Sequence, residues 1–247
     1  MSIHKLRMLF ENFIQNKIEQ ETIELELQRG FAWYRLLSAN LKSRFVQRVD
    51  VFLQAKRFVG RKDLQVSDSM RVITSAFAVQ ITFGLEHYLL PAFEYVVLYP
   101  DVYESPVTHQ LHRGETNLSG FICLSWKHLQ QKLEKEDDNL NLGIHEWAHA
   151  LRFNSFKGET TDYFFESYIN KWVACASKEF NQLKACKPSI FRKYGGTNIH
   201  EFFSVVVEHF FESPDEFKEK ANALWLQMCI LLNQVDVKGL STNFNTH

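Results

Sequence analysis

One short segment limits what this chain can fold into more than any other. Residues 141–151 read Asn-Leu-Gly-Ile-His-Glu-Trp-Ala-His-Ala-Leu, an apolar stretch that contains the motif H-E-x-x-H. On a helix, residues four apart share one face, so the imidazoles of His145 and His149 would point in the same direction. Both can then bind one ion, and zinc suits them because it accepts neutral imidazole nitrogen and leaves a position open for water. We therefore expect one Zn2+ per chain.

The glutamate directly after the first histidine is expected to have a different role. Glu146 lies about 100° further round the helix than His145, beside the ion but outside its ligand set. From there its carboxylate can accept a proton from a water molecule. We therefore expect Glu146 to act as a general base.

A catalytic zinc ion usually needs a third protein ligand, and the apolar segment 199–211 supplies the candidates. This pattern predicts a buried helix, in which the carboxylate of Glu201 would be costly without a partner; a divalent cation is the partner that offsets the cost best. His200 competes for the same role. Adjacent helical residues diverge by about 100°, so only one of the two can face the ion. Glu208, seven residues after Glu201, shares its helix face and would either support a ligand or pair elsewhere in the core.

A tyrosine precedes this helix. Tyr194 stands before a Gly-Gly turn that can carry its phenol back over the cleft. The hydroxyl could donate a hydrogen bond to a carbonyl oxygen as negative charge develops there. Most tyrosines in such turns simply pack, so this feature alone is weak.

Composition and periodicity predict a mainly helical fold. The 247 residues include only 10 glycines and 5 prolines, below the usual shares of about 7% and about 5%. Apolar residues at three- and four-residue steps predict helices along most of the chain. The expected helices cover about 1–20, 38–57, 67–84, 139–152, 162–184, 198–211 and 215–232.

Two short segments between these helices predict strands. Residues 93–99 and 121–126 are rich in aromatic and β-branched residues, and turn residues bound them. The polar stretch 106–120 is expected to form an extended loop or hairpin, and 132–138 a solvated turn. We expect the strand 121–126 to form one wall of the cleft and to bind an extended peptide through its main chain.

Charge and hydropathy exclude several classes of function. Lys and Arg number 28 and Asp and Glu 29, so no general field attracts nucleic acid or anionic lipid. Neither a signal sequence nor an apolar run of about 20 residues is present, which predicts a cytoplasmic protein with no membrane partner. The four cysteines lack metal-binding spacing and are expected to be buried or free thiols.

Taken together, the motifs resemble those of the Mlc titration factor A family, the M90 metallopeptidases. The resemblance extends from about Phe31 to about Phe217, and the spacing of Tyr194 to Glu201-Phe202-Phe203 is its most specific part. It implies the ligands His145, His149 and Glu201, and so decides against His200. It also implies Glu146 as the general base and Tyr194 as the residue that stabilises the transition state.

The sequence departs from the family pattern at two places. Arg152 stands where the family commonly has Asp, so a carboxylate that could support a ligand is replaced by a cation, unless that side chain points to solvent. The family's Gly-Glu-Ser-Trp stretch is altered to Gly-Glu-Thr-Asn at 114–117, where substrate contacts would lie.

From these inferences we expect one fold and two alternative functions. The fold class is α+β: a mostly helical, zincin-like metallopeptidase with a small sheet beside the H-E-x-x-H helix. Residues 1–247 form a single domain, with a helical extension at 1–30 and a polar tail at 233–247. The chain either hydrolyses peptide or protein substrates, or holds zinc while it binds a regulatory protein partner such as a transcriptional repressor.

Overall fold

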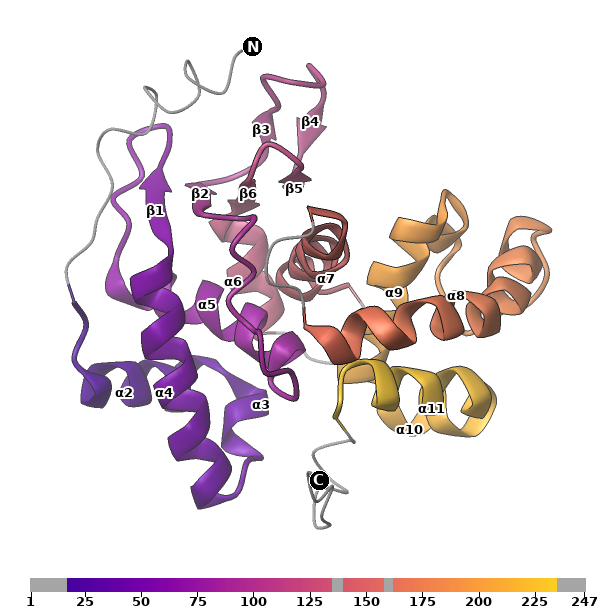
Figure 1. Ribbon diagram of the computed structural model, residues 1–247. Coiled ribbons are helices and arrows are strands. Elements are labelled where there is room, and N and C mark those ends of the chain that lie inside the picture. The colour runs from indigo at the N-terminus through magenta and orange to yellow at the C-terminus, as the bar shows by residue number, and fades with distance from the viewer. Residues whose placement is uncertain (1–16, 135–139, 158–161, 235–247) are drawn as a thin grey trace.

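The structure is a computed structural model that describes residues 17–134, 140–157 and 162–234. It is mostly helical with a small mixed sheet, as the sequence predicts (Figure 1). The helices are α2 (Gln20–Gly30), α3 (Ala32–Arg35), α4 (Ala39–Ala55), α5 (Asp68–Thr82), α6 (Trp126–Glu134), α7 (Leu142–Asn154), α8 (Tyr163–Lys184), α9 (Ile199–Glu212), α10 (Pro214–Lys220) and α11 (Asn222–Leu231), with short 3-10 helices η1 (Ser155–Lys157) and η2 (Lys193–Gly196).

The main sheet has the strand order β1-β2-β6-β5. Its strands are β1 (Arg57–Gly60), β2 (Tyr95–Tyr99), β6 (Phe121–Ser125) and β5 (Gly114–Asn117). The first three are parallel, and β5 runs antiparallel to β6. The prediction that 121–126 forms the cleft wall is therefore wrong, because β2 and β5 cover both edges of β6. The edge strand is β5, which lies in the stretch predicted to be a loop or hairpin.

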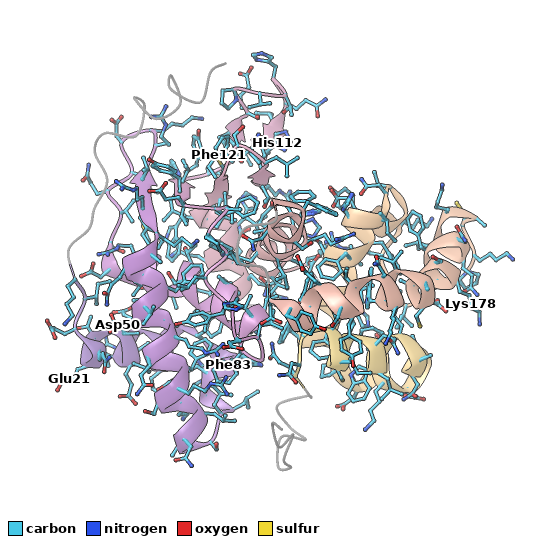
Figure 2. The ribbon with its side chains drawn as sticks, in the orientation of Figure 1. Glu21, Asp50, Phe83, His112, Phe121 and Lys178 are labelled. Carbon is cyan, nitrogen blue, oxygen red and sulfur yellow. The ribbon has the colours of Figure 1, made fainter. Side chains whose placement is uncertain are left out.

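The two faces of the sheet are buried in different ways. Side chains of one face, among them Phe58, Val96 and Ile122, belong to the large core that also contains the helices. The other face forms a small cluster with Tyr103 of the hairpin β3 (Tyr103–Glu104) and β4 (Leu111–His112). The rings of Tyr99 and Tyr103 stack there with centroids 3.9 Å apart. Figure 2 shows His112 and Phe121 together at this end of the molecule, far from Lys178 on α8.

Helix α5 fixes the position of α7 within the core. Every residue from Arg71 to Thr82 is buried. A Cβ on Gly143 would lie 2.4 Å from the ring of Phe77, so the two helices can approach this closely only with glycine at that position. The indole Nε1 of Trp147 also donates a hydrogen bond to the carbonyl of Thr74, at 3.1 Å. Helix α7 is thus held between α2–α5 on one side and α8–α11 on the other (Figure 1).

Two further predictions need correction. The helix expected over 215–232 is divided at Ala221, whose φ of −138° and ψ of 48° are not helical, and the bend lets Phe217 of α10 and Met228 of α11 both reach the core. The solvated turn expected over 132–138 begins instead within α6. There Lys132 is buried and forms an ion pair with Glu212 at 2.9 Å.

The remaining sequence predictions fall partly outside the described residues. The helix expected over the first twenty residues lies mostly in 1–16, which the structure does not describe, and α2 begins only at Gln20. Ser67 caps α5, since its Oγ accepts a hydrogen bond from the Met70 amide. None of the four cysteines, all of which lie in the described part of the chain, forms a disulfide. Among the described helices, none has both the length and the apolar content needed to cross a bilayer.

Candidate metal centre

The two motif histidines lie on the buried face of α7. The side chain of Asn141 starts this helix by accepting a hydrogen bond from the Ile144 amide, at 3.0 Å. His145 and His149 are 8% and 7% exposed, and their Nε2 atoms are 3.2 Å apart. The helix thus points two imidazoles at one small volume, as its periodicity predicts.

Helix α9 brings a carboxylate to the same point. Asn198 caps α9 by accepting hydrogen bonds from the amides of His200 and Glu201. The Oε2 atom of Glu201 then lies 3.1 Å from the Nε2 of His145 and 3.3 Å from that of His149. His200 points elsewhere, since its ring packs against Phe153 and Phe156. Of the two residues that the sequence left in competition, only Glu201 reaches the histidines.

The three ligand atoms fit a zinc ion in both geometry and charge. They all lie within 4.8 Å of one another. The three distances, 3.2, 3.1 and 3.3 Å, are close to the edge of about 3.3 Å expected between tetrahedral ligands that are each about 2.0 Å from zinc. Arg192 forms an ion pair with Glu208, and the carboxylates of Glu146 and Glu201 lie beside the same imidazoles, so a divalent cation would offset negative charge at this point.

The outer nitrogen of His145 is held by a buried carboxylate. Glu208 is 1% exposed, and its Oε1 accepts a hydrogen bond from His145 Nδ1 at 2.7 Å. The other oxygen accepts one from the backbone amide of Asn141, at 2.7 Å, and Arg192 forms an ion pair with the same carboxylate. These contacts orient the ring so that Nε2 faces the ligand cluster. Glu208 therefore supports a candidate ligand, the first of the two roles considered from sequence.

Carboxylates shift the pKa of His145, and imidazoles shift the pKa of Glu201. Burial lowers the pKa of His145, but hydrogen bonds to Glu201 and Glu208 outweigh burial and raise the pKa to about 10. Burial raises the pKa of Glu201, but the hydrogen bonds from His145 and His149 outweigh it and hold that pKa well below its usual range. In the absence of a cation, a proton on the imidazoles supplies part of the positive charge that the cation would bring.

His149 lacks the equivalent support. Its Nδ1 is buried and has no hydrogen-bond partner among the described residues. The ring stacks on Phe153, with centroids 5.7 Å apart and an angle of 18° between the planes. Arg152 lies over the ring of Phe156, 4.2 Å from its centroid, and donates a hydrogen bond to Ser155 Oγ at 3.3 Å. Arg152 therefore turns towards its helical neighbours, and on the outer side of the His149 ring the contacts among the described residues are packing contacts.

The carboxylate of Glu146 is placed by the edge strand β5. Thr116 Oγ1 lies 2.8 Å from both Oε2 and the backbone oxygen of Glu146, and its single hydroxyl hydrogen can be donated to either oxygen. A Cβ on Gly114 would lie 2.6 Å from Oε1, so glycine is needed where the strand passes this side chain. Burial raises the pKa of Glu146, while the imidazoles of His145 and His149 act against the shift. A carboxylate with a raised pKa is suited to accept and return a proton near neutral pH.

Tyr194 stands at the open side of the same centre. It lies in η2, directly before α9, and is 50% exposed. Its ring centroid is 5.9 Å from that of His145. Burial and the nearby carboxylate of Glu201 raise the pKa of the phenol to about 12. The hydroxyl therefore keeps its proton at neutral pH and can donate a hydrogen bond.

A cleft of about 820 Å³ opens beside these residues. His145, Glu146 and Tyr194 line it, together with Gly114 of β5 and His128 of α6. Sequence reasoning missed two residues that act here, Thr116 and Arg192. The altered stretch 114–117 was a signal for the first, since it marked this segment as functional. Nothing in the sequence pattern indicated that Arg192 would contact Glu208, 16 positions away.

Comparison with known proteins gives one family and several distant relatives. The model of the family described as glucose-regulated metallo-peptidase M90 matches residues 7–231. Mlc titration factor A of Enterobacter sp. (strain 638) is 26% identical over 227 residues, or 84% of each chain. Mlc titration factor A of Salmonella arizonae is 26% identical over 219 residues, 80% of this chain and 85% of the relative. An uncharacterized protein of Synechocystis sp. is 26% identical over 216 residues, 78% of this chain and 76% of the relative.

Proposed function

Because this chain belongs to the M90 family of glucose-regulated metallopeptidases, we propose that it is a zinc-dependent peptidase that hydrolyses peptide bonds. The observation that carries the proposal is the convergence of two imidazole nitrogens and one carboxylate oxygen within 4.8 Å at the side of a cleft. His145, His149 and Glu201 would hold the ion. When bound, zinc supplies Lewis acidity, which makes a water molecule more acidic and polarises a carbonyl group.

The residues around the ligands would carry the proton transfers. Glu146, oriented by Thr116, would take a proton from water and later give it to the leaving amine. Tyr194 would donate its hydroxyl hydrogen to the carbonyl oxygen as negative charge develops there, because its phenol stays protonated at neutral pH. Arg192 and Glu208 would keep the His145 ring fixed during turnover.

The edge strand β5 supports a peptide as substrate. Among the described strands it pairs only with β6, along one edge, and Gly114 at its start lines the cleft beside Glu146. An extended peptide could add to the free edge through main-chain hydrogen bonds, which is the role first expected of 121–126. A motif helix beside a sheet with an antiparallel edge strand also supports a zincin-like architecture. The large core shared by α5, α7 and α9 supports a single domain.

A second function remains open for the same site. The relatives named Mlc titration factor A suggest a protein that binds a regulatory partner, and this chain could hold zinc for such binding with little hydrolysis. A third possibility is a purely structural zinc ion, which predicts that removing the metal unfolds the protein.

Replacing Glu146 by Gln separates these functions. In a peptidase, Glu146→Gln should lower the hydrolysis of chromogenic peptides or amino-acid amides by roughly a thousandfold, while bound zinc stays near one per chain. The matched control is Glu104→Gln, because Glu104 is exposed on β3 and should leave the rate unchanged. Both proteins are assayed with and without a chelator, and their metal content is measured.

The outcomes exclude one another. If the wild type and Glu146→Gln cleave nothing but bind a protein partner equally, the regulatory function is correct. If the wild type contains no zinc when it is purified without chelator, the proposed mechanism is wrong. It is also wrong if the Glu146→Gln variant cleaves the substrates as well as the wild type does. If the wild type cleaves nothing, binds no protein partner and unfolds when the chelator is added, as followed by circular dichroism, the ion is purely structural.

A further inference from the structure

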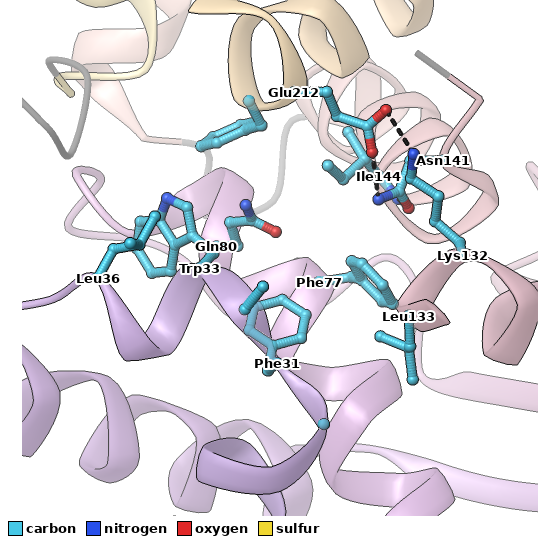
Figure 3. Close-up of a pocket in the computed structure, with 13 residues that line it drawn as sticks. Phe31, Trp33, Leu36, Phe77, Gln80, Lys132, Leu133, Asn141, Ile144 and Glu212 are labelled. Atoms are coloured by element: carbon cyan, nitrogen blue, oxygen red, sulfur yellow. Dashed lines mark hydrogen bonds and ion pairs between the residues drawn. The ribbon is translucent and has the colours of Figure 1, made fainter. Parts of the chain in front are cut away.

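A second, smaller cavity lies between α3, α5, α7 and α9. Its volume is about 130 Å³. We call it the aromatic pocket and define it by the side chains of Phe31, Trp33, Phe77, Phe211, Gln80 and Glu212 (Figure 3). Four aromatic rings form its apolar wall. A cavity of about 150 Å³ lined by apolar side chains is large enough to hold benzene in another protein, so a molecule of one ring fits this volume.

The pocket contains a polar group that has no partner. Gln80 is 4% exposed, and its Oε1 is buried without a hydrogen-bond partner among the described residues. Figure 3 shows its amide between Trp33 and the group formed by Glu212, Asn141 and Lys132. A buried carbonyl oxygen without a donor is unfavourable, because the hydrogen bond to water that it loses is not replaced. A ligand that carries an N–H or O–H group would supply the missing donor.

The charges at the pocket cancel. Lys132 and Glu212 form a buried ion pair at 2.9 Å, with side chains that are 6% and 7% exposed. Asn141 donates a further hydrogen bond to Glu212 Oε1, at 2.9 Å. Among the residues that the structure describes, no other charged side chain lines the cavity. A charged ligand would therefore be desolvated without a counter-ion of its own, whereas a neutral one would not incur this cost.

We propose that the aromatic pocket binds a small neutral organic molecule with one ring, or an aliphatic body of similar size, and one hydrogen-bond donor that reaches Gln80 Oε1. The rings of Phe31, Trp33, Phe77 and Phe211 contact the body of the ligand, and Gln80 selects for the donor. This site is separate from the ligand cluster of His145, His149 and Glu201, so the proposal does not rest on peptidase activity.

The experiment titrates the full chain with three probes that differ only in their polar group. Benzyl alcohol has a donor, toluene has none, and benzoate is charged. Binding is followed by nuclear magnetic resonance of the protein, with the indole signal of Trp33 as the reporter. We expect benzyl alcohol to bind more tightly than toluene, and benzoate to bind at least tenfold more weakly than benzyl alcohol.

Substitution of Gln80 tests whether its Oε1 accepts a hydrogen bond from the ligand. Gln80→Leu keeps the volume but removes the acceptor, so benzyl alcohol should bind about fivefold more weakly while toluene binds as before. Gln130→Leu is the matched control, because Gln130 is exposed on α6 outside the pocket, and it should change neither affinity. If Gln80→Leu weakens both probes equally, or neither, the assignment of Gln80 is wrong.

Filling the cavity tests the site itself. Leu133→Trp adds a ring to the wall and should weaken benzyl alcohol and toluene by at least tenfold. Leu36→Trp, at a rim position that is 57% exposed, should do the same and is used if Leu133→Trp does not fold. Equal binding of benzyl alcohol to the wild type and a folded filled variant would overturn the proposal, as would no shift of the Trp33 signal with any probe.

Discussion

The candidate metal centre has two sides that are built differently. On the His145 side, the outer ring nitrogen donates to Glu208, and Asn141 and Arg192 hold that carboxylate in turn. On the His149 side, the outer nitrogen has no partner among the described residues, and the ring rests on Phe153. One imidazole is therefore fixed by charge and hydrogen bonds, and the other by apolar contact. The affinity of this site for a metal should therefore depend mostly on the His145 side.

The largest expected effect comes from removing the carboxylate of Glu208. Partners of this kind orient a metal-binding imidazole, so Glu208→Gln should weaken zinc binding by roughly 10- to 100-fold. The counterpart on the other side is Phe153→Leu, which changes only packing and should alter the affinity by less than about threefold. Both are measured by competition with a chromophoric chelator. Equal losses in the two variants would contradict the asymmetry.

The second prediction concerns the proton on His145 in the metal-free protein. Burial lowers its pKa, but Glu201 and Glu208 raise it to about 10, so at pH 7 zinc must displace a proton. The affinity should therefore rise up to about tenfold per pH unit below pH 10. Because the folded pKa exceeds the unfolded value of about 6.5, protonated His145 stabilises the metal-free fold below pH 6.5, and this contribution is lost as the pH rises towards 10.

Calorimetry in buffers of different ionisation enthalpy measures that proton directly. The wild type should release about one proton per zinc bound at pH 7, and Glu208→Gln should release less, because half of the carboxylate support is gone. Chemical denaturation of the metal-free protein at pH 6.5 and at pH 9.5 checks the stability. A protein that becomes more stable over this interval would contradict the assignment to His145.

On the His149 side of the candidate centre, we expect one substitution to increase the affinity for zinc. Arg152 lies three residues after His149, one turn along α7, and now packs on Phe156. Arg152→Asp would place a carboxylate near the unpartnered Nδ1 and should strengthen zinc binding by about threefold to tenfold. Arg152→Ala removes the same cation without adding an acceptor and should give no gain. If both variants gain equally, the effect is due to charge and not to a new hydrogen bond.

The smallest expected effect distinguishes two contacts of Asn141. Its side chain caps α7, and its backbone amide donates a hydrogen bond to Glu208. Asn141→Ala removes the side chain that caps the helix and contacts Glu212, and should lower the free energy of unfolding by about 1 kcal/mol. The backbone amide that donates to Glu208 stays, so zinc affinity should change little. Asn198→Ala, which removes the cap of α9, is the comparison. A large loss of zinc affinity in Asn141→Ala alone would mean that the cap also positions His145.

Sequence reasoning succeeded where the information is local. The helices around 142–154, 163–184 and 199–212 follow from apolar periodicity, and the family resemblance is confirmed by the match over residues 7–231. The spacing of His145 and His149 predicts that their rings share one face, and the structure places the carboxylate of Glu201 beside them. The roles of these residues in catalysis stay predictions.

Prediction from the sequence failed where contacts between residues far apart in the chain determine the structure. The position of β6 inside the sheet depends on pairing with both β2 and β5, which no pattern within 121–126 records. The charges of 132–138 suggested solvent, but Lys132 is buried because its partner Glu212 comes from α9, 80 positions further along the chain. Four-residue strands such as β1 carry too few residues for an alternating pattern.

The origin of the ligands in two distant helices has a consequence for the lifetime of the molecule. His149 and Glu201 are 52 positions apart, and all of α8 lies between them. An ion shared by α7 and α9 would act as a removable cross-link around this loop, present in the folded chain and absent from the unfolded one. Cells short of zinc would then hold a form that opens more often and is digested sooner.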